Sequence, residues 1–149
     1  MPKQTTALQR REPSVSPARP RALVAEADEL LRARVAAALR EAGYEVVEAQ
    51  DGFEALDEIL VLPWREAAPG VDLVLAGVDM PGYDGLEVLA RVRAMGNLAP
   101  FVLMDRGGDP ATCREAARLG ADRILEDPSE LDEVTSAAFG LAPVGPGLP

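Results

Sequence analysis

The chain has 149 residues, of which 48% are hydrophobic, so one domain can bury a proper core without disulfide bridges. The single cysteine, Cys113, excludes an internal disulfide, and no apolar run has the length of a signal peptide or a membrane span, so we expect a cytoplasmic protein. Because the net charge is −10, we expect that the folded part does not bind nucleic acid.

The two ends of the chain differ in composition from its middle. Residues 1–20 contain four prolines, and residues 1–21 carry five basic side chains against one acidic side chain. We therefore expect a disordered basic tail over residues 1–20 and a second tail, rich in Pro and Gly, over residues 140–149. Residues 21–139 form the predicted domain.

Within that domain, short apolar runs alternate with segments of helical periodicity. The apolar runs predict strands over 22–26, 44–49, 71–78, 100–104 and 122–126. The periodic segments, bounded by signals such as Asp28, Gly43 and Pro110, predict helices over 28–43, 51–62, 84–96, 109–120 and 129–140. This alternation predicts an α/β fold, with a five-stranded parallel sheet and five helices on its two faces.

The candidate site lies just beyond the carboxyl ends of the strands, where open sheets of this kind bind their ligands. The residues at these strand ends are mostly acidic: Glu26, Asp28, Asp79, Asp105, Glu126 and Asp127, with Gly77 ending the third strand. The chain has no histidine, and its only lysine, Lys3, lies in the tail. The absence of histidine excludes catalytic Ser–His and Cys–His pairs. The segment after the first strand, "AEADELL", has no glycine, which excludes a glycine-rich phosphate loop there.

Three interpretations of these acids remain open from the residues themselves. They can cap helices and face water, which we expect of Asp28 and Asp109. They can hold a divalent cation, or they can form a carboxylate pair for acid–base chemistry. If Glu26, Asp105 and Asp127 converge, at least one should have a raised pKa, unless Arg106 or Arg123 offsets the repulsion.

Three stretches of the chain resemble the receiver domain of two-component response regulators, the CheY-like family. They are "LREAGYEVVEAQDGFEAL", "DLVLAGVDMPGYDGLEVL" and "AARLGADRILEDP", in that order along the chain. The resemblance covers about residues 22–139 and implies the flavodoxin-like (βα)5 fold.

The resemblance also implies a chemistry that this chain departs from. A receiver accepts a phosphoryl group from a histidine kinase on an aspartate, with Mg²⁺ held by that aspartate and an acidic pair, and with a hydroxyl and a lysine nearby. The matching positions here are Gly77 for the acceptor, Glu26 and Ala27 for the acidic pair, Asp105 for the hydroxyl, Asp127 for the lysine and Ile124 for the switch aromatic. An acyl phosphate needs a carboxylate nucleophile, which glycine lacks.

We therefore predict a degenerate receiver, without enzymatic activity, that acts as a phosphorylation-independent adaptor in a two-component-type pathway. Its partner would be another signalling or scaffold protein, bound through the face of the fourth helix, fifth strand and fifth helix, as the resemblance implies. No cofactor is expected to be required; if Mg²⁺ binds, Glu26 and Asp79 are the candidate ligands. The alternatives are phosphorylation at a non-standard acceptor, Asp79, and sensing of a divalent cation or other ligand. The segment "LPWREAAPG" is either an inert loop or a partner contact anchored by Trp64.

Overall fold

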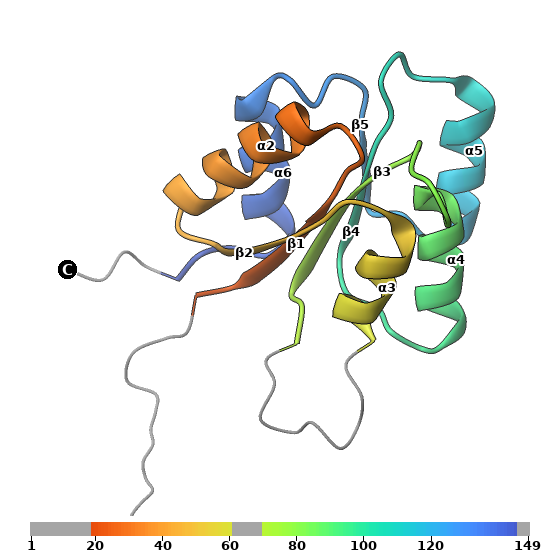
Figure 1. The fold of residues 1–149 in the computed structure, drawn as a ribbon, viewed down its shortest axis with the longest axis horizontal. Helices are drawn as coiled ribbons and strands as arrows, with labels where there is room; N and C mark the ends of the chain where they lie inside the picture. The colour runs from red at the N-terminus through yellow and green to blue at the C-terminus, as the bar shows by residue number, and fades with distance from the viewer. Residues whose placement is uncertain (1–18, 61–69, 146–149) are drawn as a thin grey trace, which may run out of the picture.

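The computed structural model describes residues 19–60 and 70–145. They contain a five-stranded parallel sheet in the order β2-β1-β3-β4-β5, shown in Figure 1. The strands are β1 (Arg21–Ala25), β2 (Glu45–Ala49), β3 (Leu73–Gly77), β4 (Phe101–Met104) and β5 (Arg123–Leu125). The predicted fold class is confirmed.

Helices cover both faces of the sheet. They are α2 (Glu29–Glu41), α3 (Gly52–Ile59), α4 (Gly85–Ala94), α5 (Pro110–Leu119) and α6 (Leu131–Leu141). Helices α2 and α6 lie together on one face, and α3, α4 and α5 cover the other, as Figure 1 shows. Helices α2, α3, α4 and α5 each lie between two parallel strands, and α6 follows β5, so every loop that follows a strand reaches the same edge of the sheet.

Strand β1 illustrates how the sheet supplies both halves of the core. Ala22 and Val24 face the α2 and α6 side, whereas Leu23 and Ala25 face the side of α3, α4 and α5. Successive side chains of a strand point to opposite faces, and here both faces are covered. A central strand of this kind reads as a continuous apolar run, which is why its position was predictable from the sequence.

The predicted helix signals are confirmed at several ends. The side chains of Asp28 and Asp109 accept hydrogen bonds from the backbone amides of Leu31 and Thr112, and so cap α2 and α5. Gly120 ends α5 in the left-handed conformation, with φ of 98°.

Most predicted boundaries differ from the structure by one to three residues, and helices α3 and α6 are two examples. Helix α3 ends at Ile59, and the end predicted at residue 62 lies outside the described residues. Helix α6 begins at Leu131 and continues to Leu141. Ala142 is buried, and the Tyr44 hydroxyl donates a 2.6 Å hydrogen bond to the Ala142 carbonyl, so the packed domain extends beyond residue 139.

Some predictions fall on residues that the structure does not describe. Most of the predicted basic tail (residues 1–18), the segment that contains Trp64 (residues 61–69) and residues 146–149 are among them. Within the described ranges, no helix has both the length and the apolar character needed to cross a bilayer.

Candidate functional site

The candidate site is a cavity at the carboxyl edge of the sheet, beside the adjacent strands β1 and β3. The chain leaves β1 for α2 on one face and leaves β3 for α4 on the other, so a crevice opens between the two connections. The cavity has a volume of about 220 Å³ and is lined by Glu26, Ala27, Asp28, Val78, Asp79, Met104 and Arg106. The structure therefore has a cavity at the predicted location, beyond the carboxyl ends of the strands.

The side chain of Glu26 fills the space in front of Gly77. A Cβ atom added at Gly77 would lie 2.5 Å from Oε1 of Glu26, closer than side chains tolerate. The pairing of Ala25 with Ala76 across β1 and β3 brings Glu26 and Gly77 alongside each other, one residue further on. Glu26 is only 7% exposed, so its carboxylate belongs to the interior edge of the cavity.

The Glu26 carboxylate is held by the backbone at the start of α2. Its Oε2 accepts a 2.9 Å hydrogen bond from the Asp28 amide. Arg32 donates from Nη1 to the Glu26 carbonyl oxygen at 2.8 Å, which fixes the backbone of the same residue. Glu26 is therefore anchored at both ends, and its carboxylate is not free to swing into solvent without breaking a bond.

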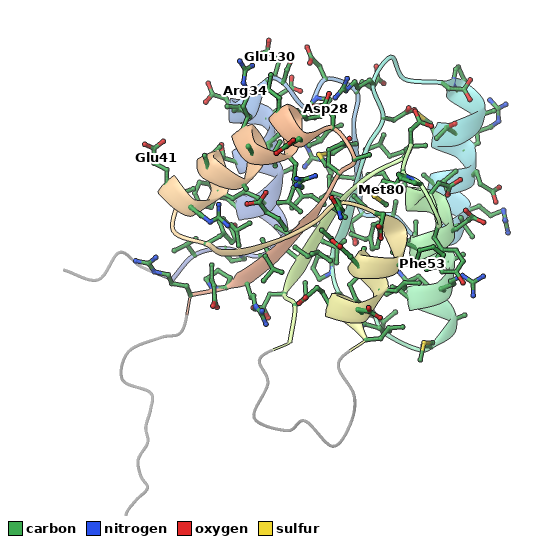
Figure 2. The ribbon with its side chains drawn as sticks, in the orientation of Figure 1. Asp28, Arg34, Glu41, Phe53, Met80 and Glu130 are labelled. Atoms are coloured by element: carbon green, nitrogen blue, oxygen red, sulfur yellow. The ribbon has the colours of Figure 1, made fainter. Side chains whose placement is uncertain are left out.

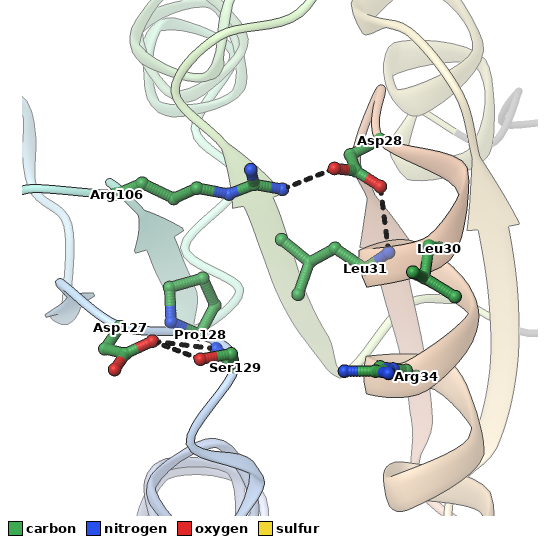
Figure 3. Close-up of a pocket in the computed structure, with 8 residues that line it drawn as sticks. All are labelled: Asp28, Leu30, Leu31, Arg34, Arg106, Asp127, Pro128 and Ser129. Atoms are coloured by element: carbon green, nitrogen blue, oxygen red, sulfur yellow. Dashed lines mark hydrogen bonds and ion pairs between the residues drawn. The ribbon is translucent and has the colours of Figure 1, made fainter.

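Asp28 connects the helix cap to a cation at the cavity. Its Oδ1 accepts from the Leu31 amide at 3.0 Å, and its Oδ2 accepts from Nη2 of Arg106 at 2.8 Å, as Figure 3 shows. Arg106 follows β4 by two residues and lines the cavity together with Glu26. The ion pair thus bridges the loops after β1 and β4.

The environment shifts the pKa values of two carboxyl groups at the cavity in opposite directions. Burial raises the pKa of Glu26, although the Asp28 amide and the Arg106 charge act against this. The hydrogen bond from Arg106 lowers the pKa of Asp28. The sequence predicted a raised pKa from repulsion among converging carboxylates, whereas the pKa of Glu26 is raised by burial.

The convergence predicted for Glu26, Asp105 and Asp127 is not found. Asp105 is buried, but its Oδ2 accepts from the Asp109 amide at 3.1 Å, so it braces the loop before α5 and does not line the cavity. Asp127 is exposed and accepts from the Ser129 amide at 3.2 Å and from the Ser129 hydroxyl. It lines a neighbouring cavity of about 290 Å³, seen in Figure 3, which shares Asp28 and Arg106 with the cavity of Glu26.

The remaining predicted positions are divided between the site and the core. Asp79 is exposed and lines the same cavity as Glu26. Ile124, at the switch position, is half-buried and packs against the core on the α3, α4 and α5 side. Arg123 is exposed and lines a groove between β5 and α6, whereas Arg106 reaches the acidic cavity. The sequence indicated both arginines as cations that could offset the repulsion among the carboxylates, but it did not indicate which of them lies at the cavity.

The residues at this cavity do not fit the Mg²⁺ ion that the receiver resemblance implies. Ala27 and Gly77 offer no side-chain ligand. One oxygen of Glu26 and both oxygens of Asp28 already accept hydrogen bonds from this chain. In the ranges 19–60 and 70–145, no group of three or more His, Cys, Asp or Glu side chains is arranged to hold a metal ion.

Comparison with known proteins identifies the family. Residues 22–139 match the model of the response regulator receiver domain. The rice (Oryza sativa subsp. japonica) two-component response regulator ORR41 is 37% identical over 126 residues, covering 82% of this chain and 95% of that protein. The transcriptional regulatory protein FixJ of Bradyrhizobium diazoefficiens is 40% identical over 73 residues, covering 48% of this chain and only 36% of that protein.

A solved structure gives the same result. The chemotaxis protein CheY4 of Vibrio cholerae superposes with a TM-score of 0.70 at 25% identity, covering 83% of this chain and 99% of that one. Residues 22–139 include all five strands except the first residue of β1, and all but the last two residues of α6. The chain therefore belongs to the response regulator receiver domain family.

Proposed function

We propose that this chain is a phosphorylation-independent pseudo-receiver that acts as an adaptor in a two-component-type pathway. The observation that carries the proposal is the Glu26 carboxylate in the space facing Gly77. The receiver reaction needs a carboxylate nucleophile at the end of β3, and glycine has none. The place of that nucleophile is taken by a residue that is itself hydrogen-bonded to the Asp28 amide.

The surroundings of Gly77 also disfavour a phosphoryl group. A phosphoryl dianion at the end of β3 would stand beside the Glu26 carboxylate, and two unit charges about 4 Å apart repel by roughly 1 to 4 kcal/mol, depending on the local dielectric. The position of the receiver lysine holds Asp127, which is turned toward Ser129. The sole lysine of the sequence, Lys3, precedes the domain.

A second candidate function rests on the position of Asp79. Its side chain is exposed and lines the same cavity as Glu26, so it is the carboxylate that a small phosphodonor would meet. Phosphorylation at Asp79 would make the chain a receiver with a displaced acceptor. No cofactor is required under the adaptor proposal, whereas this alternative needs a cation to stabilise the transferring group.

Incubation with acetyl phosphate and Mg²⁺, followed by intact mass measurement, separates the two. The adaptor proposal expects the mass of the natural protein to stay unchanged. A single phosphoryl adduct that disappears in Asp79→Asn would establish the displaced acceptor and overturn the proposal. The variant Asp84→Asn is the matched control, since Asp84 caps α4 and does not line the cavity.

The partner of the adaptor is proposed to be another signalling or scaffold protein that binds the face formed by α5, β5 and α6. Strand β5 is an edge strand of the sheet, and half of the residues that line the groove between it and α6 are acidic, including Glu126, Asp132 and Glu133. We place this adaptor in the cytoplasm, in keeping with its single cysteine.

Charge reversal tests this face. Once a partner has been captured with the natural chain, Glu133→Arg should weaken its binding, because Glu133 lies in the groove. Glu41→Arg is the matched control: Glu41 is exposed at the far end of α2, as Figure 2 shows. Equal loss of binding in both variants, or in neither, would reject the α5, β5 and α6 face.

A further inference from the structure

The cavity beside Glu26 contains three carboxylates and one cation. The carboxylates are those of Glu26, Asp28 and Asp79, and the cation is Arg106. Carboxylates that share a cavity repel one another unless a positive charge lies between them. In a receiver with the full set of residues that charge would come from a metal ion, whereas here it comes from the chain.

We propose that Arg106 is a built-in counter-cation that takes the place of a bound divalent metal ion at the carboxyl edge of the sheet. Its Nη2 donates to Oδ2 of Asp28 at 2.8 Å, which engages the oxygen that would otherwise face a cation. Oδ1 of Asp28 is already committed to the cap of α2. Arg106 therefore neutralises the carboxylates and removes a ligand from them at the same time.

The loop after β4 is built to hold Arg106 in this place. Gly107 and Gly108 follow it with φ of 90° and 62°, backbone conformations that residues with a side chain rarely adopt, so the chain turns sharply there. The turn is closed by a hydrogen bond from the Gly108 amide to the Asp105 carbonyl at 3.2 Å. The Asp105 side chain accepts from the Asp109 amide, which ties the same loop to the start of α5.

Stability alone does not explain the ion pair. The side chains of Arg106 and Asp28 are 58% and 43% exposed, and exposed ion pairs contribute little to folding. The neighbouring arginine, Arg34, lines the second cavity and not that of Glu26. What distinguishes Arg106 is its charge beside the carboxylates.

This inference goes beyond the adaptor function and can fail separately from it. Phosphorylation by acetyl phosphate would overturn the adaptor function. The counter-cation is tested by metal binding in the absence of any phosphodonor.

The test measures binding of Mn²⁺, from the loss of the free-ion signal in electron paramagnetic resonance, for the full chain and four variants. Arg106→Lys keeps the positive charge, Arg106→Met and Arg106→Gln remove it, and Arg34→Met is the matched control. We expect the natural chain, Arg106→Lys and Arg34→Met to bind Mn²⁺ weakly and alike. Arg106→Met and Arg106→Gln should bind at least about tenfold more tightly, and their melting temperatures should rise with added Mg²⁺ at constant ionic strength. Adding Asp28→Asn to Arg106→Met should abolish the gain.

Two results would overturn the inference. One is tight Mn²⁺ binding by the natural chain that Asp28→Asn abolishes, since the cavity would then hold a metal beside Arg106. The other is a folded Arg106→Met or Arg106→Gln that binds no more Mn²⁺ than Arg34→Met. A merely structural role of Arg106 would lower the melting temperature of both variants without any response to metal, and so gives the second result.

Discussion

Oε1 of Glu26 lies 2.5 Å from the position that a Cβ atom on Gly77 would occupy, so these two residues share one space at the end of β3. Glu26 is 7% exposed and its other oxygen accepts from the Asp28 amide. Each residue therefore limits the other: the carboxylate stays where it is only while residue 77 has no side chain.

A double-mutant cycle tests this shared space. Gly77→Ala should destabilise the natural chain by about 1 kcal/mol, because the carboxylate must leave its hydrogen bond to make room. In Glu26→Ala the same substitution should be neutral or stabilising, since alanine restricts the unfolded chain more than glycine does. Urea unfolding of the four proteins gives a coupling energy, which we expect to be in the range of about 0.5 to 3 kcal/mol. Additive effects of the two substitutions would show that the Glu26 side chain relaxes without cost.

The pH dependence of stability should report the buried carboxyl of Glu26. Its folded-state pKa is raised, so the native state holds a proton that the unfolded chain has released above about pH 4.3. The stability linked to this proton is present below the unfolded pKa and is lost as pH rises through the folded pKa. In urea unfolding at pH 5 and pH 7, Glu26→Gln should therefore gain stability relative to the natural chain as pH rises.

The other shifted carboxyls do not obscure this window. Asp28, Asp109 and Glu115 have lowered pKa values, so their contributions are lost only as pH falls below the ordinary carboxyl range. Asp127→Asn is the control, because Asp127 lies outside the cavity of Glu26. An unchanged difference in stability between Glu26→Gln and the natural chain at the two pH values would mean that Glu26 is already ionised at pH 5.

The fold was predictable because local signals and core packing agree along the chain. Strands β1 and β3 read as unbroken apolar runs since both of their faces are covered. The caps Asp28 and Asp109 were predictable from residue type and spacing alone, because a short acidic side chain before a helix has one nearby set of amides to bind.

The site was predictable in its location but not in its contacts. The contact between Glu26 and Gly77 depends on the register of β1 against β3 and on the rotamer of the Glu26 side chain. Neither can be predicted from the sequence pattern. Asp127 was expected to face the apex, yet it binds Ser129 two residues later. That bond was within reach of sequence reasoning, because aspartate commonly accepts from the amide two residues on.

Restoring the acceptor alone should not restore phosphorylation. In Gly77→Asp the new side chain must displace the Glu26 carboxylate, and the added negative charge would stand beside it. The lysine position still holds Asp127 and the hydroxyl position still holds Asp105. We expect intact mass measurement after incubation with acetyl phosphate and Mg²⁺ to show no adduct.

A comparison of Gly77→Asp with a triple variant shows which positions prevent phosphorylation. Gly77→Asp combined with Asp105→Thr and Asp127→Lys returns the three positions to the residue types that the receiver resemblance implies. Labelling of Gly77→Asp alone to the same extent as the triple variant would show that the acids at 105 and 127 do not oppose the reaction. Labelling of the triple variant only would locate the obstacle in those two positions.

Arg93 should be the most important single cation for stability among the arginines with described bonds. Its side chain, 16% exposed, donates to the backbone carbonyls of Gly120, Asn97 and Ala99 at 2.8 to 3.2 Å and forms an ion pair with Asp122. It thus joins the end of α4 to the loops that lead into β4 and β5. Arg93→Met keeps the aliphatic stem but leaves these carbonyls without their charged donor, so we expect a loss of about 2 to 3 kcal/mol in the free energy of unfolding.

Arg91 provides the matched control on the same helix. Its guanidinium carbon lies 4.1 Å from the centroid of the Tyr83 ring, an exposed cation–π contact whose loss in Arg91→Met should cost about 0.5 to 1 kcal/mol. Urea unfolding at pH 7 measures both variants against the natural chain. If Arg93→Met loses no more stability than Arg91→Met, water replaces the guanidinium at those carbonyls, and the contacts of Arg93 fix loop geometry without stabilising the domain.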